Sequence, residues 1–164
     1  MRGRRTAGLV ATLAVVGCSV QPHVEISSGT GESADFAKHV KYYDIHLPAG
    51  ATGLEWVELR DWDVNEIYLR FATDRVGLAS FLGTYRLTPS ALMDTTRSQA
   101  LPRESGWDDE LPARFADWQP TSWPARATDQ VDDTDSNGLP LYVDLLVDNP
   151  AGARPTVFVR IMQT

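Results

Sequence analysis

Side chains that could hold a hard metal ion are concentrated in one short acidic segment. Residues 133–138 read Asp-Thr-Asp-Ser-Asn-Gly, which places oxygen-bearing side chains at alternate positions and a glycine at the sixth. Such oxygens can converge on one calcium ion, while the glycine permits the sharp turn. The candidate ligands are Asp133, Asp135, Asn137, the backbone carbonyl of Leu139 and Asp144.

Over twelve residues this pattern resembles the calcium loops of EF-hand and dockerin proteins. It departs from them at Pro140 in the eighth position and at Asp144, where those loops more often carry Glu. In addition, residues 141–147 alternate like a strand where the resemblance would imply a helix. A solvated acidic turn before a strand uses the same residue types. We favour the turn, and calcium is the one cofactor that the sequence suggests.

Tryptophans form a second group with possible chemistry. Trp62, Trp107 and Trp123 lie in or beside predicted loops, where exposed indoles could stack on the sugar rings of a cell-wall ligand. Tryptophans in long, proline-rich loops also pin those loops to a domain, and we favour this interpretation. Trp118 follows Leu111 and Phe115 at helical spacing, which predicts a core position.

No catalytic set emerges from the histidines and carboxylates. Asp44 and His46 are two residues apart in a candidate strand, so the carboxylate could orient the imidazole, but no nucleophile motif accompanies them. His23 and His39 fall in a predicted tether that could not hold a catalytic geometry. Carboxylate pairs such as Glu55 with Glu58, or Asp61 with Asp63, arise readily among 22 acidic residues. We therefore expect a protein that is not an enzyme.

Hydrophobic periodicity predicts the elements that would position these groups. Alternation predicts strands at residues 43–47, 65–72 and, less cleanly, 54–60, with a hairpin connection at 61–65. Thr73 and Asp74 offer N-cap side chains for a helix over residues 74–84. The strongest pattern is a C-terminal hairpin of residues 141–148 and 157–161 around a turn at 149–152. We expect residues 86–140 to be irregular, apart from one short helix through Trp118.

This order of elements predicts an α+β fold. We expect an antiparallel sheet of about five strands, one main helix packed on it, and a C-terminal β-hairpin. A β-sandwich is the alternative if the irregular region contains further strands.

The N-terminus carries an export signal. Arg2, Arg4 and Arg5 precede a short apolar run at residues 9–16, which is too short for a transmembrane helix and suits a secretory signal. Val15-Val16-Gly17-Cys18 then resembles the lipobox of bacterial lipoproteins. That resemblance implies cleavage before Cys18 and acylation of its thiol, with palmitate among the expected acyl groups. The alternatives of general secretory and twin-arginine export stay open.

Composition restricts the partners of the mature chain. Cys18 is the one cysteine, which excludes an internal disulfide and a cysteine-based zinc site. Loss of residues 1–17 leaves 147 residues and lowers the formal net charge from −7 to −10, so nucleic-acid binding is not expected. Thirteen arginines against two lysines are typical of GC-rich genomes such as those of actinobacteria.

Together these features predict three regions: a signal peptide at 1–17, lipidated Cys18 with a flexible tether at 18–41, and one globular domain at 42–164. We expect a lipoprotein of the cell envelope, anchored on the extracytoplasmic face of the cell membrane. Its domain would bind an envelope protein or a cell-wall ligand without catalysis. The alternative is a small cell-wall-active enzyme or glycan-binding module.

Overall fold

The computed structural model describes residues 25–60, 65–95, 100–101, 118, 120–121, 125–127, 131–134, 138 and 140–163. Its elements are β1 (Glu25–Thr30), α1 (Phe36–Tyr42), β2 (Thr52–Arg60), β3 (Asn65–Ala72), α2 (Arg75–Thr84), the 3₁₀ turn η1 (Pro89–Ala91), β4 (Met93–Thr95), β5 (Ala125–Ala127), β6 (Val131–Thr134), β7 (Pro140–Asp148) and β8 (Thr156–Gln163).

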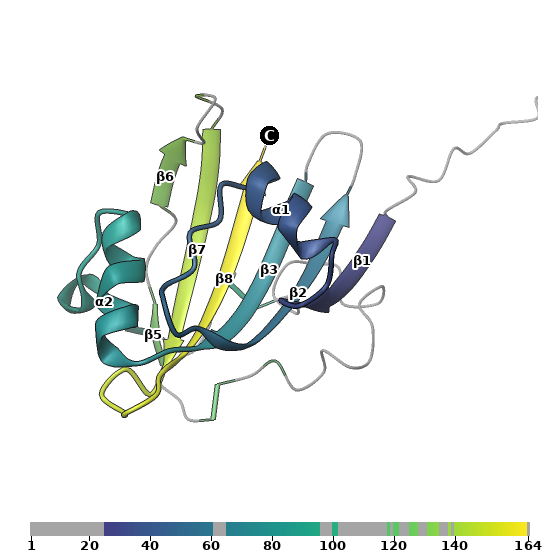
Figure 1. Ribbon diagram of the computed structural model, residues 1–164. Coiled ribbons are helices and arrows are strands. Elements are labelled where there is room, and N and C mark those ends of the chain that lie inside the picture. The colour runs from purple at the N-terminus through teal and green to yellow at the C-terminus, as the bar shows by residue number, and fades with distance from the viewer. Residues whose placement is uncertain are drawn as a thin grey trace, which may run out of the picture.

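All described strands belong to one antiparallel sheet with the order β1-β2-β3-β8-β7-β5-β4. In addition, β6 pairs with residues 140–143 of β7, and β5 pairs with residues 146 and 147 of the same strand. The five longer strands are β1, β2, β3, β8 and β7 (Figure 1). This arrangement confirms the predicted α+β fold and its C-terminal hairpin, in which Leu141 pairs with Gln163 and Asp148 with Thr156. A β-sandwich is not the fold of the part of the chain that the structure describes.

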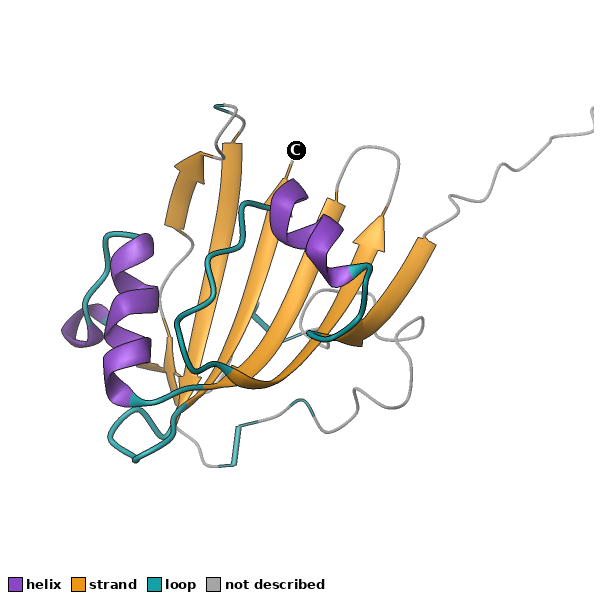
Figure 2. Ribbon diagram, in the orientation of Figure 1, coloured by secondary structure: helices purple, strands orange, loops and turns teal. Residues whose placement is uncertain are grey.

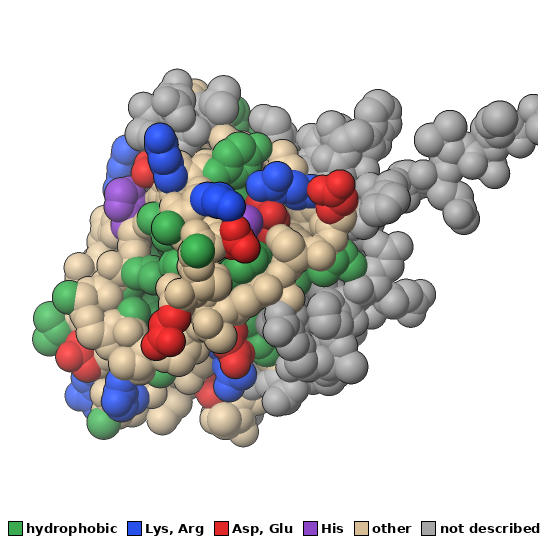
Figure 3. Space-filling model, turned by 45° about the vertical axis from the view of Figure 1, so that its right-hand side comes forward, with side chains coloured by type: hydrophobic (Ala, Val, Ile, Leu, Met, Phe, Trp, Pro, Cys, Tyr) green, Lys and Arg blue, Asp and Glu red, His purple; other side chains and the backbone are tan. Residues whose placement is uncertain are grey.

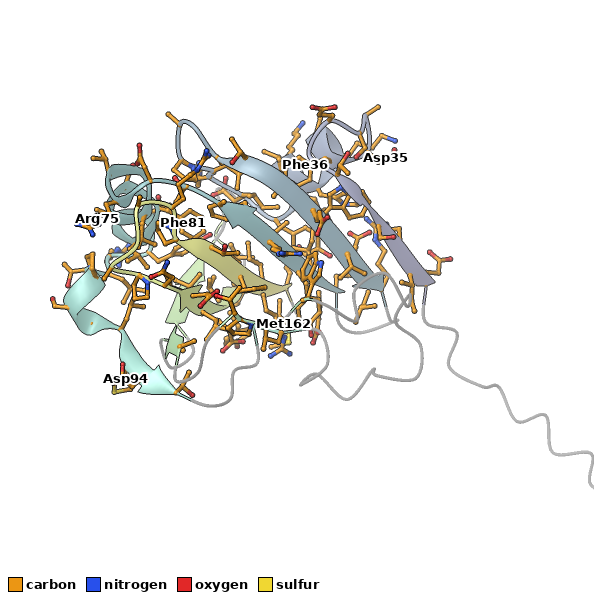
Figure 4. The ribbon with its side chains drawn as sticks, turned by 90° about the horizontal axis from the view of Figure 1, so that it is seen from below. Asp35, Phe36, Arg75, Phe81, Asp94 and Met162 are labelled. Atoms are coloured by element: carbon orange, nitrogen blue, oxygen red, sulfur yellow. The ribbon has the colours of Figure 1, made fainter. Side chains whose placement is uncertain are left out.

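Helices α1 and α2 cover the same face of the sheet (Figure 2). On that face a core forms from residues at alternate strand positions, such as Ile67, Leu69 and Phe71 of β3, together with Phe81 of α2. The opposite face has its own core, which includes Tyr68 and Phe158. Figure 4 shows this layering, with Phe36 and Phe81 on the helix side and Met162 on the other side. Because both faces are covered, the central strands bury residues of both parities.

The two helices begin and end for different local reasons. The side chain of Asp74 accepts a hydrogen bond from the Gly77 N–H at 2.7 Å, which confirms the predicted N-cap of α2. At the end of α1, Asp44 adopts a left-handed conformation with φ of 50°, and the Ile45 N–H donates to the Val40 carbonyl. These are the features of a Schellman cap.

That cap explains why the predicted strand at residues 43–47 is wrong. Tyr43 and Ile45 are buried against the sheet, so alternate residues are apolar, yet the described segment after α1 pairs with no strand. In this motif the apolar residue just after the helix packs back against the helix. Ile45 is apolar for this reason, and together with Tyr43 it gives the alternation that is also typical of a strand.

The predicted tether also ends too late. Residues 25–30 form edge strand β1, which pairs with β2 from Glu25↔Arg60 to Thr30↔Glu55, and α1 follows within residues assigned to the tether. The folded domain therefore begins by residue 25 instead of residue 42. The Ser27 hydroxyl of β1 donates to Glu58 of β2, a compensation that the local sequence does not reveal.

Candidate functional site

The sequence-predicted site residues fall mostly outside the described part of the chain. This holds for Cys18, Trp62, Trp107, Trp123, Asp135, Asn137 and Leu139. Trp118 is described and buried, and its indole N–H donates to Glu55 at 3.1 Å. Its predicted core position is therefore confirmed, while the rest of the helix predicted around it lies outside the described residues.

The two described members of the candidate calcium loop are not brought together. Asp133 lies in β6 opposite Leu141, and Asp144 lies three residues further along β7 than Leu141. Three residues along a strand span about 10 Å of backbone. No group of acidic or histidine side chains suitable for a metal is found among the described residues.

Asp144 has a different partner. Its carboxylate accepts a hydrogen bond from Arg160 at 3.1 Å, and Arg160 also donates to Glu66 at 2.6 Å. The Tyr68 hydroxyl donates to the same Glu66 at 2.7 Å. Burial raises the pKa of Asp144, and the nearby Arg160 only partly offsets this. Burial alone would lower the pKa of Arg160, but the hydrogen bond to Glu66 and neighbouring negative groups raise it. This cluster joins β3, β8 and β7 on the face opposite the helices.

The three pairings of carboxylates and histidine considered from the sequence have separate outcomes. His46 Nε2 does lie 3.3 Å from Asp44 Oδ1, but on an exposed loop and not on a strand. Glu55 and Glu58 do not form a pair, because they lie three residues apart on β2 and face opposite sides of the sheet. Glu55 contacts Arg70 at 3.4 Å on one side. Asp61 and Asp63 lie outside the described residues.

A cleft of about 630 Å³ lies beside α1 at the β1 edge of the sheet. In the space-filling view of Figure 3, acidic and basic side chains lie next to one another on the face that is seen. The cleft is lined by residues from β1, β2 and the start of α1: Glu25, Ile26, Ser27, Ser28, Asp35, Lys38, His39, Trp56, Glu58 and Arg60. Its size falls within the range of small-molecule binding sites.

Glu58 lies in the wall of this cleft and is 3% exposed. Its Oε1 accepts hydrogen bonds from the Tyr43 hydroxyl and Arg60 Nη2, each at 3.0 Å. Its Oε2 accepts from the Ser27 hydroxyl at 3.2 Å and lies 3.0 Å from Arg60 Nε. One buried carboxylate thus joins β1, β2 and the end of α1.

His39 completes this arrangement from α1. The side chain is 6% exposed, and its ring packs on the Trp56 indole with centroids 4.3 Å apart. Nδ1 is buried and lies 3.2 Å from Glu58 Oε1, although the angle is not that of a hydrogen bond.

Trp56 closes the edge of β1 through a close approach that requires glycine. A Cβ placed on Gly29 would lie 2.9 to 3.0 Å from indole atoms of Trp56. The indole N–H reaches past this position to donate to the Thr30 carbonyl at 3.1 Å. The missing side chain at residue 29 therefore allows the indole to form one wall of the cleft.

Three pKa directions describe the electrostatics around the cleft. Burial, and then the charge of Glu58, raises the pKa of Tyr43 above its ordinary range. The hydrogen bond to Glu58 raises the pKa of Arg60. The hydrogen bond and charge of Lys38 lower the pKa of Asp35, at a Nζ–Oδ1 distance of 2.7 Å. Each of these shifts is caused mainly by burial or by a charged neighbour in the same cleft.

The sequence did contain a signal for this site. Phe36, Val40 and Tyr43 recur at i, i+4 and i+7, the spacing of a helix with one buried face, and His39 lies on that face. Assigning these residues to a tether excluded His39 and left Glu58 as one of many carboxylates.

Comparisons with protein-family models, with curated proteins and with solved structures found no match to this chain. No helix in the described ranges has the length and apolar character needed to cross a membrane.

Proposed function

We propose that this chain is an exported, lipid-anchored envelope protein, and that its folded domain binds a small ligand in the cleft beside α1. The observation that carries the binding part is the imidazole of His39. This side chain is 6% exposed and lines the cleft, and its Nδ1 is a buried nitrogen without a hydrogen-bond partner in the part of the chain that the structure describes. Buried polar groups are normally paired, so the unpaired edge of His39 is suited to a ligand.

The state of Glu58 supports binding over catalysis. A general base must accept a proton readily at the working pH. Donors from Tyr43, Arg60 and Ser27 already occupy both oxygens of this carboxylate, so neither oxygen is directed at a substrate. Hydrolysis of ester, peptide or glycan substrates by the purified chain, abolished in His39→Ala, would contradict this part of the proposal.

The membrane anchor is supported by the lipobox sequence that ends at Cys18. Expression in a bacterial host with labelled palmitate should give a labelled protein in the membrane fraction. Cys18→Ser should lose both the label and the membrane association. A Cys18→Ser chain that stays in the membrane fraction and is still labelled would refute lipidation at this residue.

A cleft-blocking substitution tests the binding site. Ser27 is exposed and lines the cleft, so Ser27→Tyr should fill part of it. The matched control is Ser80→Tyr, which makes the same change at an exposed position of α2. The full chain, purified in detergent, is incubated with a polar small-molecule extract of bacterial envelopes, and retained compounds are identified by mass spectrometry.

We expect the same compounds to be retained by the unmodified chain and by Ser80→Tyr, and to be lost with Ser27→Tyr. Equal retention by all three chains would place binding elsewhere on the protein. Retention of nothing by the unmodified chain would overturn the small-ligand proposal.

A further inference from the structure

One side of the cleft follows the pairing of β1 with β2. The residues that lie opposite one another along it are Glu25 and Arg60, Ser27 and Glu58, and Gly29 and Trp56. Directly opposed residues of two paired strands have their side chains on the same face, and successive pairs of this kind lie about 7 Å apart. A pair of opposite charges thus lies at one end of the series, and an aromatic side chain lies at the other.

Arg60 presents a positive group in a fixed orientation. Its Nε and Nη2 each lie 3.0 Å from an oxygen of Glu58, and its Cζ lies 5.7 Å from the centre of the Tyr42 ring. These contacts fix the plane of the guanidinium group and leave Nη1 without a hydrogen bond in the described part of the chain. The side chain is 46% exposed. Arg60 can therefore donate to an anionic group of a ligand without releasing Glu58.

Glu25 presents a negative group beside this arginine. It is exposed, lines the cleft and forms no ion pair with any residue that the structure describes. The other acidic side chains of the cleft have cationic partners, since Asp35 pairs with Lys38 and Glu58 with Arg60. Among the described residues of the cleft, Glu25 is therefore the carboxylate that is open to a cationic group.

We infer that the ligand is a small zwitterion, with an anionic group that accepts from Arg60 Nη1 and a primary ammonium group that pairs with Glu25. Because these side chains are cross-strand neighbours, a ligand with a single charge would contact one of them and meet the like charge of the other. A zwitterion contacts both favourably. Amino acids and short peptides have this chemistry, with a carboxylate as the anion, and so do ethanolamine phosphate headgroups. This inference rests on the proposed binding function and names its ligand class.

Removing one charge at a time from the ligand tests the two contacts. Alanine, dialanine, trialanine and glycerophosphoethanolamine are titrated into the full chain in detergent, and binding is followed by calorimetry. Each added residue moves the two charges of a peptide apart by about 3.5 Å, so the tightest peptide reports their best separation. Each zwitterion is compared with its N-acetyl form, each peptide with its C-terminal amide, and the phosphate compound with glycerol.

We expect loss of the anionic group to weaken binding at least about tenfold, because the guanidinium group is already held in place. Loss of the ammonium group should weaken it at least about threefold, since Glu25 is exposed and its charge is screened by water. Tighter binding of a peptide or of glycerophosphoethanolamine identifies which of the two sources the cleft recognises.

Two variants assign these effects to residues. Glu25→Gln should weaken binding of the zwitterion and leave that of its N-acetyl form unchanged, whereas the control Glu32→Gln, at an exposed residue outside the cleft, should change neither. Arg60→Gln should weaken binding of the zwitterion, unlike the control Arg70→Gln at a half-exposed arginine of β3. If Arg60→Gln does not fold, nitrogen NMR of arginine side chains in the unmodified chain replaces it, and the zwitterion should shift the Arg60 resonances.

The outcomes separate this inference from the proposed function. Binding of either singly charged form as tight as that of the zwitterion overturns the inference. Equal binding in Glu25→Gln, an equal loss in Glu32→Gln, or unchanged Arg60 resonances overturns the assigned contacts. If no zwitterion binds while Ser27→Tyr still blocks retention of other compounds, the ligand class is wrong and the binding function stands. If no compound is retained at all, the binding function fails with it.

Discussion

Replacing Glu58 by Gln should test whether its carboxylate holds the N-terminal elements on the sheet. Gln has nearly the same shape, so it leaves packing intact and removes the negative charge. Its Oε1 can still accept from Tyr43, but its amide group faces donors that the carboxylate had satisfied. Arg60 Nε, 3.0 Å from Oε2, would then meet another donor or turn to water.

The size of the effect follows from the exposure of each partner. Tyr43 is fully buried, so the change from a charged to a neutral acceptor costs about 1 kcal/mol at that bond. Arg60 is half-exposed and can rehydrate, which limits the loss of its ion pair to about 1 kcal/mol. Misplaced amide protons add up to about 1 kcal/mol, giving a total of about 2 to 3 kcal/mol. A domain of this size should then melt about 6 to 12 °C lower.

Urea and thermal unfolding of the full chain in detergent, followed by circular dichroism, would measure this change. The matched control is Glu32→Gln, an identical substitution at an exposed residue in the turn after β1. It should change the free energy of unfolding by less than about 0.5 kcal/mol. Combining Glu58→Gln with Tyr43→Phe should cost less than the two single changes together, because both remove the same bond.

A Glu58→Gln chain that unfolds at the same midpoint as the unmodified chain would refute this reasoning. The contacts of Glu58 would then be replaceable by water, and β1 and α1 would be held by apolar packing alone. An equal fall in Glu32→Gln would point instead to a general effect of net charge.

Three further results are expected. The free energy of unfolding should fall as pH rises above about 10, because the raised pKa keeps Tyr43 protonated in the folded state after the unfolded chain has lost that proton. In urea titrations at alkaline pH, Tyr43→Phe should remove the part of the pH dependence that Tyr43 causes. Gly29→Ala should lower the free energy of unfolding by about 1 to 3 kcal/mol, since the new Cβ meets the Trp56 indole. Gly83→Ala, where α2 leaves open space for a Cβ, should raise it by about 0.5 to 1 kcal/mol. A Gly29→Ala chain as stable as the unmodified chain would argue against the close approach. Excess calcium should leave the melting temperature unchanged, because Arg160 holds the Asp144 carboxylate; a gain near the 2.7 kcal/mol expected at a hundredfold excess over the dissociation constant would contradict this.

The sequence predicted those elements whose own residues show a clear hydrophobic periodicity. Residues 65–72 are β3 as expected, because alternation repeats over a whole strand. The same holds for α2, where the Asp74 cap and the helical period coincide, and for the hairpin of β7 and β8. In each case local propensity and burial favour the same structure.

The N-terminal elements could not be found in the same way. Helix α1 has seven residues, too few to be stable alone, so its existence depends on packing against the sheet. Strand β1 carries Ser27, Ser28 and Gly29, which are also typical of a flexible linker. The bond from Ser27 to Glu58 joins residues 31 positions apart, and it exists only once β1 and β2 pair in register. Apart from the helical spacing of Phe36, Val40 and Tyr43, the candidate cleft is a product of tertiary contacts that the local sequence does not reveal.

The early start of the fold changes the geometry of the proposed anchor. With a tether through residue 41, a lipidated Cys18 would leave the domain free to move far from the membrane. Glu25 is instead the first residue of β1, and it lines the cleft. Six residues lie between it and Cys18, and even a fully extended chain of these seven steps spans only about 25 Å. If Cys18 carries the lipid, the cleft must therefore lie close to the membrane surface, which favours a ligand that is presented or released there.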